Sequence, residues 1–343
     1  MTAESFRAFQ ISGPGHGEIV PVPAPPLGPD AVRVRTMFSG ISRGTERLVY
    51  QGRVPPGEYQ RMRAPFQRGE FPAPVIYGYS SVGRVEAGPD EWLGYAVFCL
   101  HPHQTGYVVP TSAVVPLPGD LPPERAVLAA NMETAVNALW DAGPRVGDRI
   151  SVIGAGTLGC LVAALCARVP GVELELIDIE VARESIAQRI GAAFRLPEAA
   201  TAERDLVIHA SASEAGLRHA LALAGEEAQV IELSWYGAEA VSLPLGEAFH
   251  SRRLALRSSQ VGRIAPERAA RWSHRRRLEL ALELLRDPVF DLLVDGESHF
   301  EDLPATMAAV AAGAGGRFCH RVRYDPIHAT DAGANADVQS QRP

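Results

Sequence analysis

The pattern of apolar and polar positions changes near residue 126, from short punctuated strands to alternating strands and helices. Before that point, alternation at 32–37 and short apolar runs at 82–88 and 106–110 predict half-buried strands among many prolines and glycines. Beyond it, β-branched runs alternate with segments of helical spacing, which predicts a parallel, doubly wound α/β sheet with right-handed crossovers. The expected strands are 149–153, 173–178, 205–209, 228–234 and 254–260, and the expected helices are 126–142, 180–190 and 214–224 besides a small-residue helix that contains Gly159.

The last part of the chain returns to mixed structure. Residues 271–286 predict a strongly basic amphipathic helix, for which a solvated surface face is favoured over an interaction patch. A last helix is expected at 300–310 and a last strand at 317–324. Beyond Tyr324 the composition turns polar and small, so a disordered tail is expected at 331–343.

The strand at 149–153 runs directly into a glycine loop, Gly-Ala-Gly-Thr-Leu-Gly. In this order of strand, loop and helix, Gly154 allows a tight turn, Gly156 lets a pyrophosphate approach the backbone, and Gly159 lets the helix pack closely. The helix N-terminus offers unpaired N–H groups to the phosphates. Asp178 ends the next strand about 20 residues later, where an acid that binds ribose belongs. Cofactor contacts are therefore expected from Gly154, Gly156, Thr157, Leu158, Gly159 and Asp178.

Length, charge and cysteine usage narrow the class of protein. A chain of 343 residues exceeds the usual size of a single core, so two domains are expected. The net charge of −7 argues against nucleic acid as the main partner. No apolar stretch reaches the roughly 18 residues of a membrane span, so no membrane partner is expected. Because no signal peptide is visible and the four cysteines are scattered, a reduced, cytoplasmic compartment is expected.

Further segments carry a resemblance to a known superfamily. Ser-Gly-Ile-Ser-Arg-Gly-Thr-Glu at 39–46 stands where zinc alcohol dehydrogenases have Gly-Ile-Cys-Gly-Thr-Asp, and Gly-Tyr-Ser at 78–80 stands where they have Gly-His-Glu. The run from Asp178 to Arg183 is similar to their segment after the second strand. With the glycine loop, these segments resemble the medium-chain dehydrogenase/reductase superfamily over roughly 5–325. The sequence of 39–46, together with Gly-Arg-Val-Pro at 52–55, is similar to that of the bacteriochlorophyllide a hydroxyethyl dehydrogenase branch.

The resemblance implies a fold and a division into domains. It implies a Rossmann domain for the cofactor at 126–265 and a discontinuous, β-rich GroES-like catalytic domain built from 1–125 and 266–330. A homodimer fits the superfamily, although no interface can be identified from the residues. The partner that matters for activity is expected to be a small-molecule substrate.

The departures from the zinc pattern are as informative as the matches. Ser42 or Arg43 stands at the first zinc ligand, Tyr79 replaces the zinc histidine, and Ser80 replaces the neighbouring glutamate. The third ligand position falls near Ala130, and the four-cysteine lobe of the structural zinc is missing. A zinc site needs three or four converging Cys, His or carboxylate ligands, so no zinc is expected. Cys-Leu-His-Pro-His at 99–103 leaves metal binding or a substrate contact open, with structural or loop histidines favoured.

Without zinc, side chains must handle the substrate proton. Tyr79 could donate or accept it, or could merely fill the space that zinc leaves. Ser42 could bind a substrate oxygen or pack in a turn, and Glu46 is more readily an arginine partner than a general base. His101 is a candidate proton shuttle because an ordinary histidine pKa lies near neutrality.

Substrate and cofactor contacts can be assigned to further residues. Arginines accumulate between residues 43 and 68, either in a solvated loop or as forks for an anionic substrate group, with Arg43, Arg61 and Arg63 as candidates. Glu133 lies beside the helix that faces the nicotinamide in the superfamily and is assigned to the substrate. Thr134 is assigned to the cofactor ring.

The residues after the second strand bear on cofactor choice. A carboxylate at Asp178 accepts hydrogen bonds from both ribose hydroxyls and repels a 2′-phosphate, and Glu180 adds negative charge. These features favour NAD(H) over NADP(H), and Arg183 is the cofactor contact that would favour NADP(H).

The sequence therefore predicts a zinc-independent oxidoreductase that transfers a hydride between NAD(H) and a secondary alcohol or its ketone. The substrate is expected to be polyfunctional, with an anionic group as one option. Two alternatives stay open. One is an NADPH-dependent enoyl or quinone-type reductase that acts on an activated C=C bond, and the other is a non-catalytic sensor that binds NAD(H).

Overall fold

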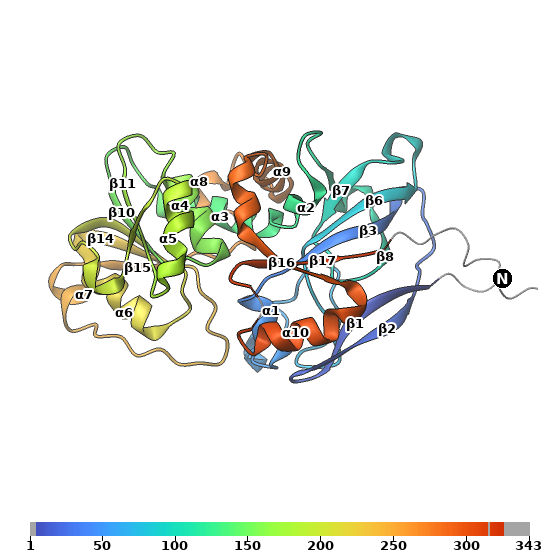
Figure 1. Cartoon of the computed structure of the whole chain (residues 1–343), viewed down its shortest axis with the longest axis horizontal. Helices are drawn as coiled ribbons and strands as arrows, with labels where there is room; N and C mark the ends of the chain where they lie inside the picture. Colours follow the sequence, from blue (N-terminus) through green and yellow to red (C-terminus); the bar gives the residue numbers. More distant parts are fainter. Residues whose placement is uncertain (1–4, 315, 326–343) are drawn as a thin grey trace, which may run out of the picture.

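The computed structural model describes residues 5–314 and 316–325, and the strands of these residues form three sheets. A part built from the middle of the chain lies beside a β-rich part that carries the N-terminal strands (Figure 1). This arrangement is the predicted α/β class with a separate β-rich unit. The tail expected at 331–343 lies outside the described residues.

The middle of the chain forms a six-stranded parallel sheet from β10 (Arg149–Ile153), β11 (Glu173–Ile177), β12 (Ala193–Arg195), β13 (Arg204–His209), β14 (Ala224–Glu232) and β15 (Ala255–Ser258). Ile150 and Val152 of β10 are fully buried, as expected for a β-branched run covered on both faces. The order β12-β11-β10-β13-β14-β15 reverses between β10 and β13. The carboxyl ends of these two strands therefore flank the crevice in which doubly wound sheets bind dinucleotides.

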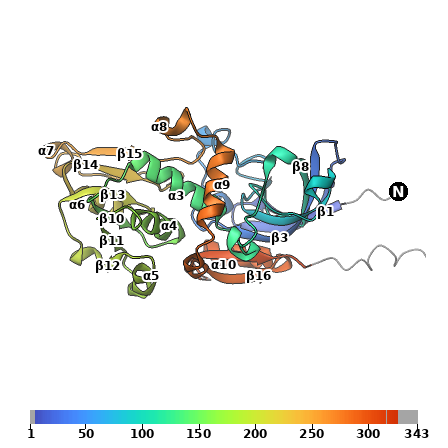
Figure 2. The same cartoon turned by 90° about the horizontal axis from the view of Figure 1, so that it is seen from above.

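Helices pack around this sheet and along its junction with the β-rich part (Figure 2). The segment 126–142, expected as one helix, is divided in two. The carbonyl of Val127 accepts the hydroxyl of Ser80 instead of continuing a regular helical turn. The helices are α2 (Pro123–Ala126), α3 (Ala129–Ala142), α4 (Thr157–Cys166), α5 (Glu184–Arg189), α6 (Glu214–Leu223), α7 (Ala248–Ser251), α8 (Pro266–Ala269) and α9 (His274–Leu284).

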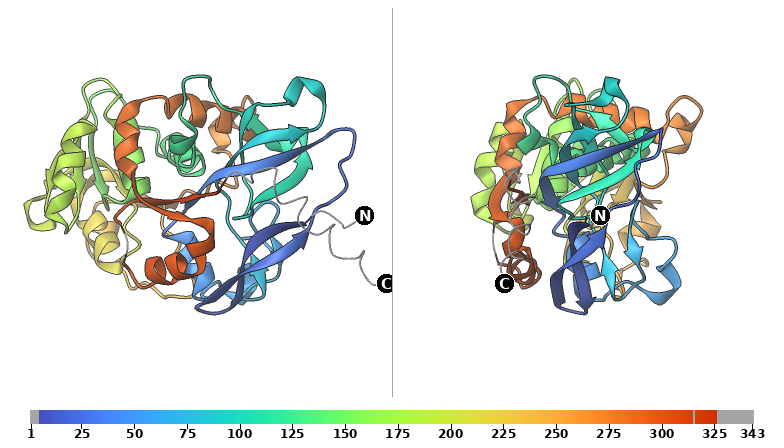
Figure 3. Two further views of the ribbon diagram at one scale, coloured as in Figure 1. Left: turned by 45° about the vertical axis from the view of Figure 1, so that its right-hand side comes forward. Right: turned by 90° about the vertical axis from the view of Figure 1, so that its right-hand side faces the viewer.

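The larger sheet of the β-rich part consists of β3 (Ala31–Ile41), β6 (Ser81–Ala87), β7 (Ala96–Cys99), β8 (Gly106–Pro110), β9 (Val114–Pro116), β16 (Val294–His299) and β17 (Cys319–Arg323). Its order is β16-β17-β3-β6-β7-β9, and β8 pairs with β3. The antiparallel pairing of β17 with β3 brings the end of the described chain back to its first third (Figure 3). The exact domain boundaries at 125 and 266 stay predictions.

The smaller sheet has the order β2-β1-β5-β4, and two helices pack beside it. Its hairpin of β1 and β2 is absent from the sequence prediction, since neither strand alternates cleanly. Among the described residues, no helix combines the length and apolar character that a bilayer crossing requires. The elements are β1 (Ser5–Gly13), β2 (His16–Pro23), β4 (Arg68–Gly69), β5 (Val75–Ile76), α1 (Thr45–Tyr50) and α10 (Leu303–Ala311).

The basic helix α9 is more than a solvated face, because one of its arginines is a core residue. Arg277 is 1% exposed and lies against α3, where its Nε donates to Glu133 Oε1 at 3.1 Å and its NH1 donates to Asn137. Arg275 donates to the carbonyl oxygens of Ser112 and Val114, in the β-rich part. The sequence prediction of a solvated face needs this correction, because α9 uses its positive charge to join the two parts of the molecule.

Replacing Arg277 by leucine is expected to lower the free energy of unfolding by about 3 kcal/mol, because Glu133 is left buried without its partner. Burial raises the pKa of the Glu133 carboxyl, and Arg277 opposes that rise. In the variant, the penalty should therefore be largest near pH 8 and should shrink towards about pH 5, as the carboxyl takes up a proton. Urea unfolding at both pH values measures this difference, with the exposed neighbour Arg276→Leu as control. Equal losses in the two variants would contradict the assignment.

Candidate active site

The glycine loop between β10 and α4 leaves an open space beside its backbone. Gly154 has a φ of +101°, a conformation that residues with a side chain rarely adopt. A Cβ at Gly159 would lie 1.8 Å from the carbonyl oxygen of Gly154, whereas a Cβ at Gly156 would meet nothing within 4 Å. The N-terminus of α4 follows at Thr157 with its unpaired N–H groups. The loop thus offers both room and donors to a phosphate group.

Asp178 lies next to the glycine loop at the carboxyl end of β11. Its Oδ2 accepts the N–H of Ala155 at 2.7 Å, and its Oδ1 accepts the N–H of Glu180 at 2.9 Å. In doubly wound sheets an acid at this point binds the ribose of the first nucleotide. Together with the loop, Asp178 makes the crevice fit a nicotinamide dinucleotide.

Arg183 is engaged with the C-terminal segment of the described chain. Its guanidinium lies 4.5 Å from the ring centroid of Phe318, and its NH1 donates to the carbonyl of Arg317 at 3.2 Å. Its Nε is buried and has no hydrogen-bond partner among the described residues. Arg183 therefore connects the segment after β11 to the β-rich part.

Three of the residues predicted for catalysis come together at α1. The hydroxyls of Ser42 and Thr45 lie near enough to the phenol of Tyr79 to lower its pKa, and the carboxylate of Glu46 lies near enough to raise it. Burial raises the pKa of Tyr79, Glu46 raises it further, and the two hydroxyls only partly oppose the rise. Tyr79 is therefore a protonated phenol at neutral pH, which makes it a hydrogen-bond donor.

A buried chain of hydrogen bonds extends from Glu46 into the β-rich part. Glu46 Oε1 accepts the backbone N–H of Ser42 at 2.8 Å, and its Oε2 lies 2.8 Å from Nε2 of His103. Nδ1 of His103 lies 2.7 Å from the Ser39 hydroxyl, which lies 2.9 Å from the hydroxyl of Tyr324. Glu46 and His103 are 2% and 1% exposed. This chain holds Glu46 in one position beside Tyr79.

Glycine at position 78 makes room for the histidine of this chain. Gly78 has a φ of +132°, and a Cβ there would lie 2.9 Å from Cδ2 of His103. A residue with a side chain would therefore be strained and would also push the imidazole away from Glu46.

The segment that follows β14 links the cluster of Tyr79, Ser42 and Glu46, here called the Tyr79 cluster, to the crevice. Trp235 packs on the buried apolar cluster that contains Tyr77, and Tyr79 packs on the same cluster. The N–H of Ala238 donates to the carbonyl of Arg53, just after α1, at 3.1 Å. The carboxyl ends of parallel strands all lie at the same edge of their sheet. The region of α1 therefore lies against the edge that also carries the glycine loop.

Comparisons with known proteins agree with this architecture. No family profile matches the chain. Over 183 residues it is 31% identical to 2-desacetyl-2-hydroxyethyl bacteriochlorophyllide A dehydrogenase of Cereibacter sphaeroides, a match that covers 47% of this chain and 48% of that protein. The aligned part thus spans about half the length of this curated relative.

Solved structures match the chain almost from end to end. A protein of Sinorhizobium meliloti 1021 described as a zinc-binding dehydrogenase, bound to NADP, superposes with a TM-score of 0.75 at 18% identity, covering 93% of this chain and 99% of its own. An alcohol dehydrogenase of Escherichia coli CFT073 complexed with NADH superposes with a TM-score of 0.72 at 15% identity, with coverage of 93% and 99%. The chain has the medium-chain alcohol dehydrogenase fold.

The positions that the resemblance assigns to the zinc ligands hold Ser42 or Arg43, Tyr79 and Ala130, with Ser80 beside Tyr79. The Ser80 hydroxyl donates to the carbonyl of Val127, and the side chain of Ala130 has no atom that could bind a metal. Within the described ranges, no group of three or more His, Cys, Asp or Glu side chains converges as a metal site. That result includes the 99–103 segment, in which Cys99 is a buried free thiol. The residues present do not fit a zinc ion held by three protein ligands.

The predicted proton shuttle His101 lies outside the Tyr79 cluster. Its ring is 5% exposed and stacks on Tyr107 with centroids 3.8 Å apart. Burial lowers its pKa to about 3, so the imidazole stays neutral over the whole physiological range. We therefore replace His101 by His103 as the histidine of the site.

The arginines proposed for an anionic substrate do not converge on Tyr79. Arg61 pairs with Glu58 at 3.0 Å, and Arg63 pairs with Glu70 at 2.8 Å, both at the surface. Arg43 donates to the carbonyl of Ala314 at 3.2 Å, and burial lowers its pKa. Of these three arginines, Arg43 is the nearest to the Tyr79 cluster along the chain, because it follows Ser42 directly.

The two residues assigned on α3 have different surroundings. Glu133 is the buried partner of Arg277, which favours a structural role over contact with substrate. Thr134 is half-buried, and its hydroxyl donates to the carbonyl of Ala130 one turn earlier, at 2.9 Å. Its role at the cofactor ring stays a prediction.

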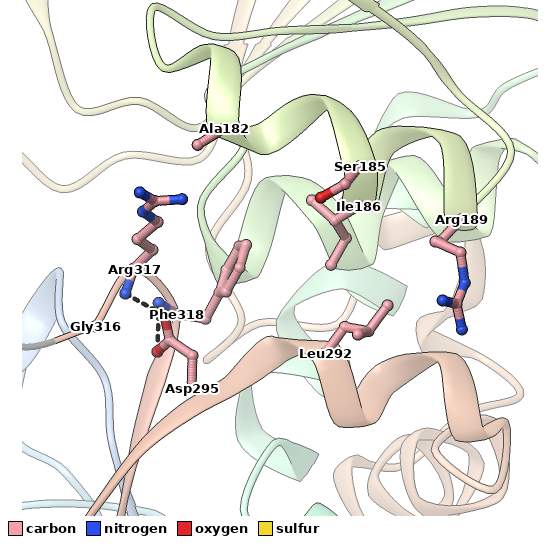
Figure 4. A pocket seen from close by; sticks show the side chains of 9 residues that line it. All are labelled: Ala182, Ser185, Ile186, Arg189, Leu292, Asp295, Gly316, Arg317 and Phe318. Carbon is pink, nitrogen blue, oxygen red and sulfur yellow. Dashed lines mark hydrogen bonds between the residues drawn. The ribbon is translucent and has the colours of Figure 1, made fainter.

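A hollow of about 540 Å³ lies between α5 and the segment that leads into β16 (Figure 4). Ile186, Leu292 and Phe318 form its apolar wall, while Arg189 and Arg317 stand at its ends. Phe318 is also the aromatic partner of Arg183. The hollow therefore adjoins the segment after Asp178 but contains none of the residues around Tyr79.

The sequence identified Glu46 and Ser42 as candidates but not the pairing of Glu46 with His103. The signal that could have revealed His103 is the glycine at 78, since a histidine can occupy the space that a glycine leaves. Ser39 and Tyr324 are separated by 285 positions, and only the pairing of β17 with β3 brings them together.

Replacing Glu46 by glutamine is expected to lower the free energy of unfolding by about 2 kcal/mol. If the amide NH₂ of the variant faces the N–H of Ser42, that buried donor loses its acceptor, and if it faces Nε2 of His103, the imidazole must change tautomer and reverse its hydrogen bond to Ser39. Urea denaturation measures the effect, and the exposed Glu70→Gln is the matched control. A loss as small as that of the control would show that Glu46 does not hold this chain of hydrogen bonds.

Proposed function

We propose that the protein is an NAD(H)-dependent oxidoreductase that interconverts a secondary alcohol and its ketone without zinc. The observation that carries the proposal is that Tyr79, Ser42 and Glu46 cluster against the side of the sheet where the open glycine loop lies. A bound nicotinamide supplies the hydride acceptor or donor. The chain's own residues must bind both ligands, orient them and handle the proton of the substrate.

The surroundings of Asp178 support NAD(H) as the coenzyme. Backbone N–H groups hold its carboxylate next to the loop, where the negative charge opposes a 2′-phosphate. Arg183, the residue that could bind such a phosphate, is engaged with Phe318 and Arg317. Since proteins of this fold are found with NADP and with NADH, the preference rests on this chain's residues alone.

The protonation state of Tyr79 supports a specific role for its hydroxyl. The raised pKa keeps the phenol protonated at neutral pH, so it can donate to a ketone oxygen as negative charge develops there. In the opposite direction the same oxygen must accept the proton of the alcohol, which requires the phenolate. Ser42 offers a second hydroxyl to orient the substrate oxygen.

Replacement of the metal ligands supports chemistry that does not use zinc. The side chains there include two hydroxyls and a phenol: the hydroxyl of Ser80 donates to the backbone, and that of Ser42 lowers the pKa of Tyr79. They remain polar, although an unused cavity would more readily fill with apolar groups. A site that keeps polar groups where metal ligands are lost is consistent with proton transfer by side chains.

The relative that shares 31% identity supports the substrate class. Its name specifies oxidation at a hydroxyethyl group of a bacteriochlorophyllide, a large and polyfunctional molecule. We extend only the reacting group to this chain, namely a secondary alcohol or its ketone. If the substrate carries an anion, Arg43 is the residue assigned to it, because Arg61 and Arg63 pair with surface carboxylates.

Replacing Tyr79 by phenylalanine is expected to lower kcat about 10²–10⁴-fold while leaving the Kd for NADH unchanged. Because the pKa of Tyr79 is raised, alcohol oxidation by the parent protein should accelerate as the pH rises from neutral to about 10, whereas ketone reduction should stay flat. The variant should lose the slope for oxidation. Absorbance of NADH with a panel of secondary alcohols and ketones measures both directions.

Two outcomes would overturn this assignment. Zinc at full stoichiometry in the purified active protein would refute the metal-free reaction, and failure of the protein to bind NADH would refute the dehydrogenase itself. The exposed Tyr95→Phe is the matched control and should leave both rates unchanged.

Replacing Asp178 by alanine is expected to reduce the ratio of kcat/KM for NAD⁺ to that for NADP⁺ about 10–100-fold, through loss of charge-assisted hydrogen bonds and of repulsion. Steady-state kinetics with both coenzymes measures the ratio. Glu180→Ala removes an equal charge at an exposed neighbouring position and should change the ratio less. An equal change in both variants would mean that general charge, rather than contact with the ribose, sets the preference.

A further inference from the structure

A second cluster of polar side chains lies at the carboxyl ends of β13 and β14. His209, the last residue of β13, is 0% exposed. Its Nδ1 lies 2.7 Å from Glu232 Oε2, and its Nε2 lies 2.6 Å from the hydroxyl of Ser211. None of these residues belongs to the Tyr79 cluster, and the predicted cofactor contacts do not include them.

The hydrogen bonds of Glu232 determine which ring nitrogen of His209 carries the proton. Burial alone would raise the pKa of Glu232, but its hydrogen bonds with His209 and Ser234 contribute to lowering it below its usual value. The carboxylate also accepts the N–H of Ser234 at 2.6 Å and the hydroxyl of Tyr236 at 3.0 Å. An ionised carboxylate can only accept, so Nδ1 of His209 must be the donor. In the neutral imidazole, Nε2 is then an acceptor.

The orientation of the Ser211 hydroxyl follows from that assignment. Its single proton is donated to Nε2 of His209, so in its 2.9 Å contact with Ser213 it must be the acceptor. Ser213 in turn accepts the N–H of Gly216 at the start of α6. The half-buried oxygen of Ser211 keeps one lone pair for a ligand. It therefore presents an acceptor and no donor.

The position of Ser211 connects this acceptor to the dinucleotide crevice. A Cβ at Gly154 of the glycine loop would lie 2.7 Å from the backbone nitrogen of Ser211, so the two segments are in direct contact. A Cβ at Gly216 would lie 2.3 Å from the hydroxyl oxygen of Ser211 and 2.7 Å from Nε2 of His209. Ala212 has a φ of +52°, which is uncommon outside glycine and marks a constrained turn. Several constraints thus hold Ser211 at the edge of the crevice.

The two halves of the parallel sheet receive different parts of a dinucleotide. The glycine loop and Asp178 belong to the half formed by β10, β11 and β12, which binds the pyrophosphate and the first ribose. His209 and Glu232 end strands of the other half, beyond the reversal of strand order. The second nucleotide of a dinucleotide therefore extends towards Ser211.

We propose that Ser211, oriented by His209 and Glu232, accepts a hydrogen bond from the nicotinamide nucleotide of the cofactor and so determines how the reactive half is positioned. The donor on the ligand is a ribose hydroxyl or the carboxamide NH₂. His209 and Glu232 are positioning residues that act through Ser211. This inference rests on the proposed use of NAD(H) and adds the specificity of the same crevice.

The test compares ligands that contain or lack the nicotinamide nucleotide. Ser211→Ala is expected to weaken NAD⁺ about 10-fold by calorimetry and to leave ADP, which contains only the first half, within twofold of the parent protein. Ser185→Ala, in the hollow beside α5, is the matched control and should change neither ligand. Melting temperatures of the variants should stay close to that of the parent protein.

A second variant tests the dependence on the histidine. In His209→Asn the amide NH₂ can still donate to Glu232, but Ser211 loses its acceptor and is free to turn its proton towards the ligand. We expect weakened binding of NAD⁺ that is not additive with Ser211→Ala, because both changes remove the same contact. The 3-acetylpyridine analogue of NAD⁺ lacks the NH₂ group. If Ser211→Ala weakens this analogue equally, the donor is the ribose, and if it does not, the donor is the carboxamide.

The outcomes separate this inference from the function on which it rests. Binding of neither NAD⁺ nor ADP to the parent protein would refute both proposals. Binding of NAD⁺ that Ser211→Ala leaves unchanged, or an equal loss for NAD⁺ and ADP, would refute only the role of Ser211. Full additivity of the two substitutions would refute the action of His209 through Ser211.

Discussion

The approach of α4 to the end of β10 is the contact on which the whole crevice depends. No atom fits between Gly159 and the carbonyl of Gly154, since a Cβ would lie 1.8 Å from that oxygen. On its other side, Gly154 touches the backbone of Ser211, at the start of the turn after β13. One glycine therefore separates the two halves of the sheet at the point where strand order reverses. A side chain at this position would displace both the phosphate loop and the turn that holds Ser211.

Buried carboxylates position the remaining parts of the site. A buried charge is costly unless donors surround it, so each such group also fixes the segments that supply its donors. Glu46 holds α1 against the loop of His103, Glu133 holds α3 against α9, and Glu232 holds the turn after β13 against that after β14. In two of the three cases the partner is a histidine with a second hydrogen bond to a serine. The chain thus uses one type of interaction to orient hydroxyl groups at separate places.

The fold was accessible from the sequence because its signals are local. The β-branched run of β10, the glycine loop and Asp178 lie within a short stretch, and their spacing reflects backbone geometry. The candidate site was accessible only in part. Ser42 and Tyr79 could be identified by their correspondence to metal ligands. His103 replaced His101 because the strand ends at Cys99, so the two histidines do not share a face and have different surroundings. The link between Ser39 and Tyr324 depends on long-range strand pairing, which local patterns do not contain.

The geometry around Glu46 connects the architecture of the site to its acid–base chemistry. A zinc ion would stabilise an alkoxide by its charge, whereas the proposed zinc-free reaction relies on hydrogen-bond donors for that oxygen. In that proposal Tyr79 serves as a donor because its phenol remains protonated, and Glu46 is one of the groups that raise its pKa. Glu46 cannot move away, since the N–H of Ser42 and the imidazole of His103 hold both of its oxygens. The carboxylate of Glu46 therefore makes the phenolate costly, so in the proposed reaction proton donation to a ketone is favoured over proton removal from an alcohol.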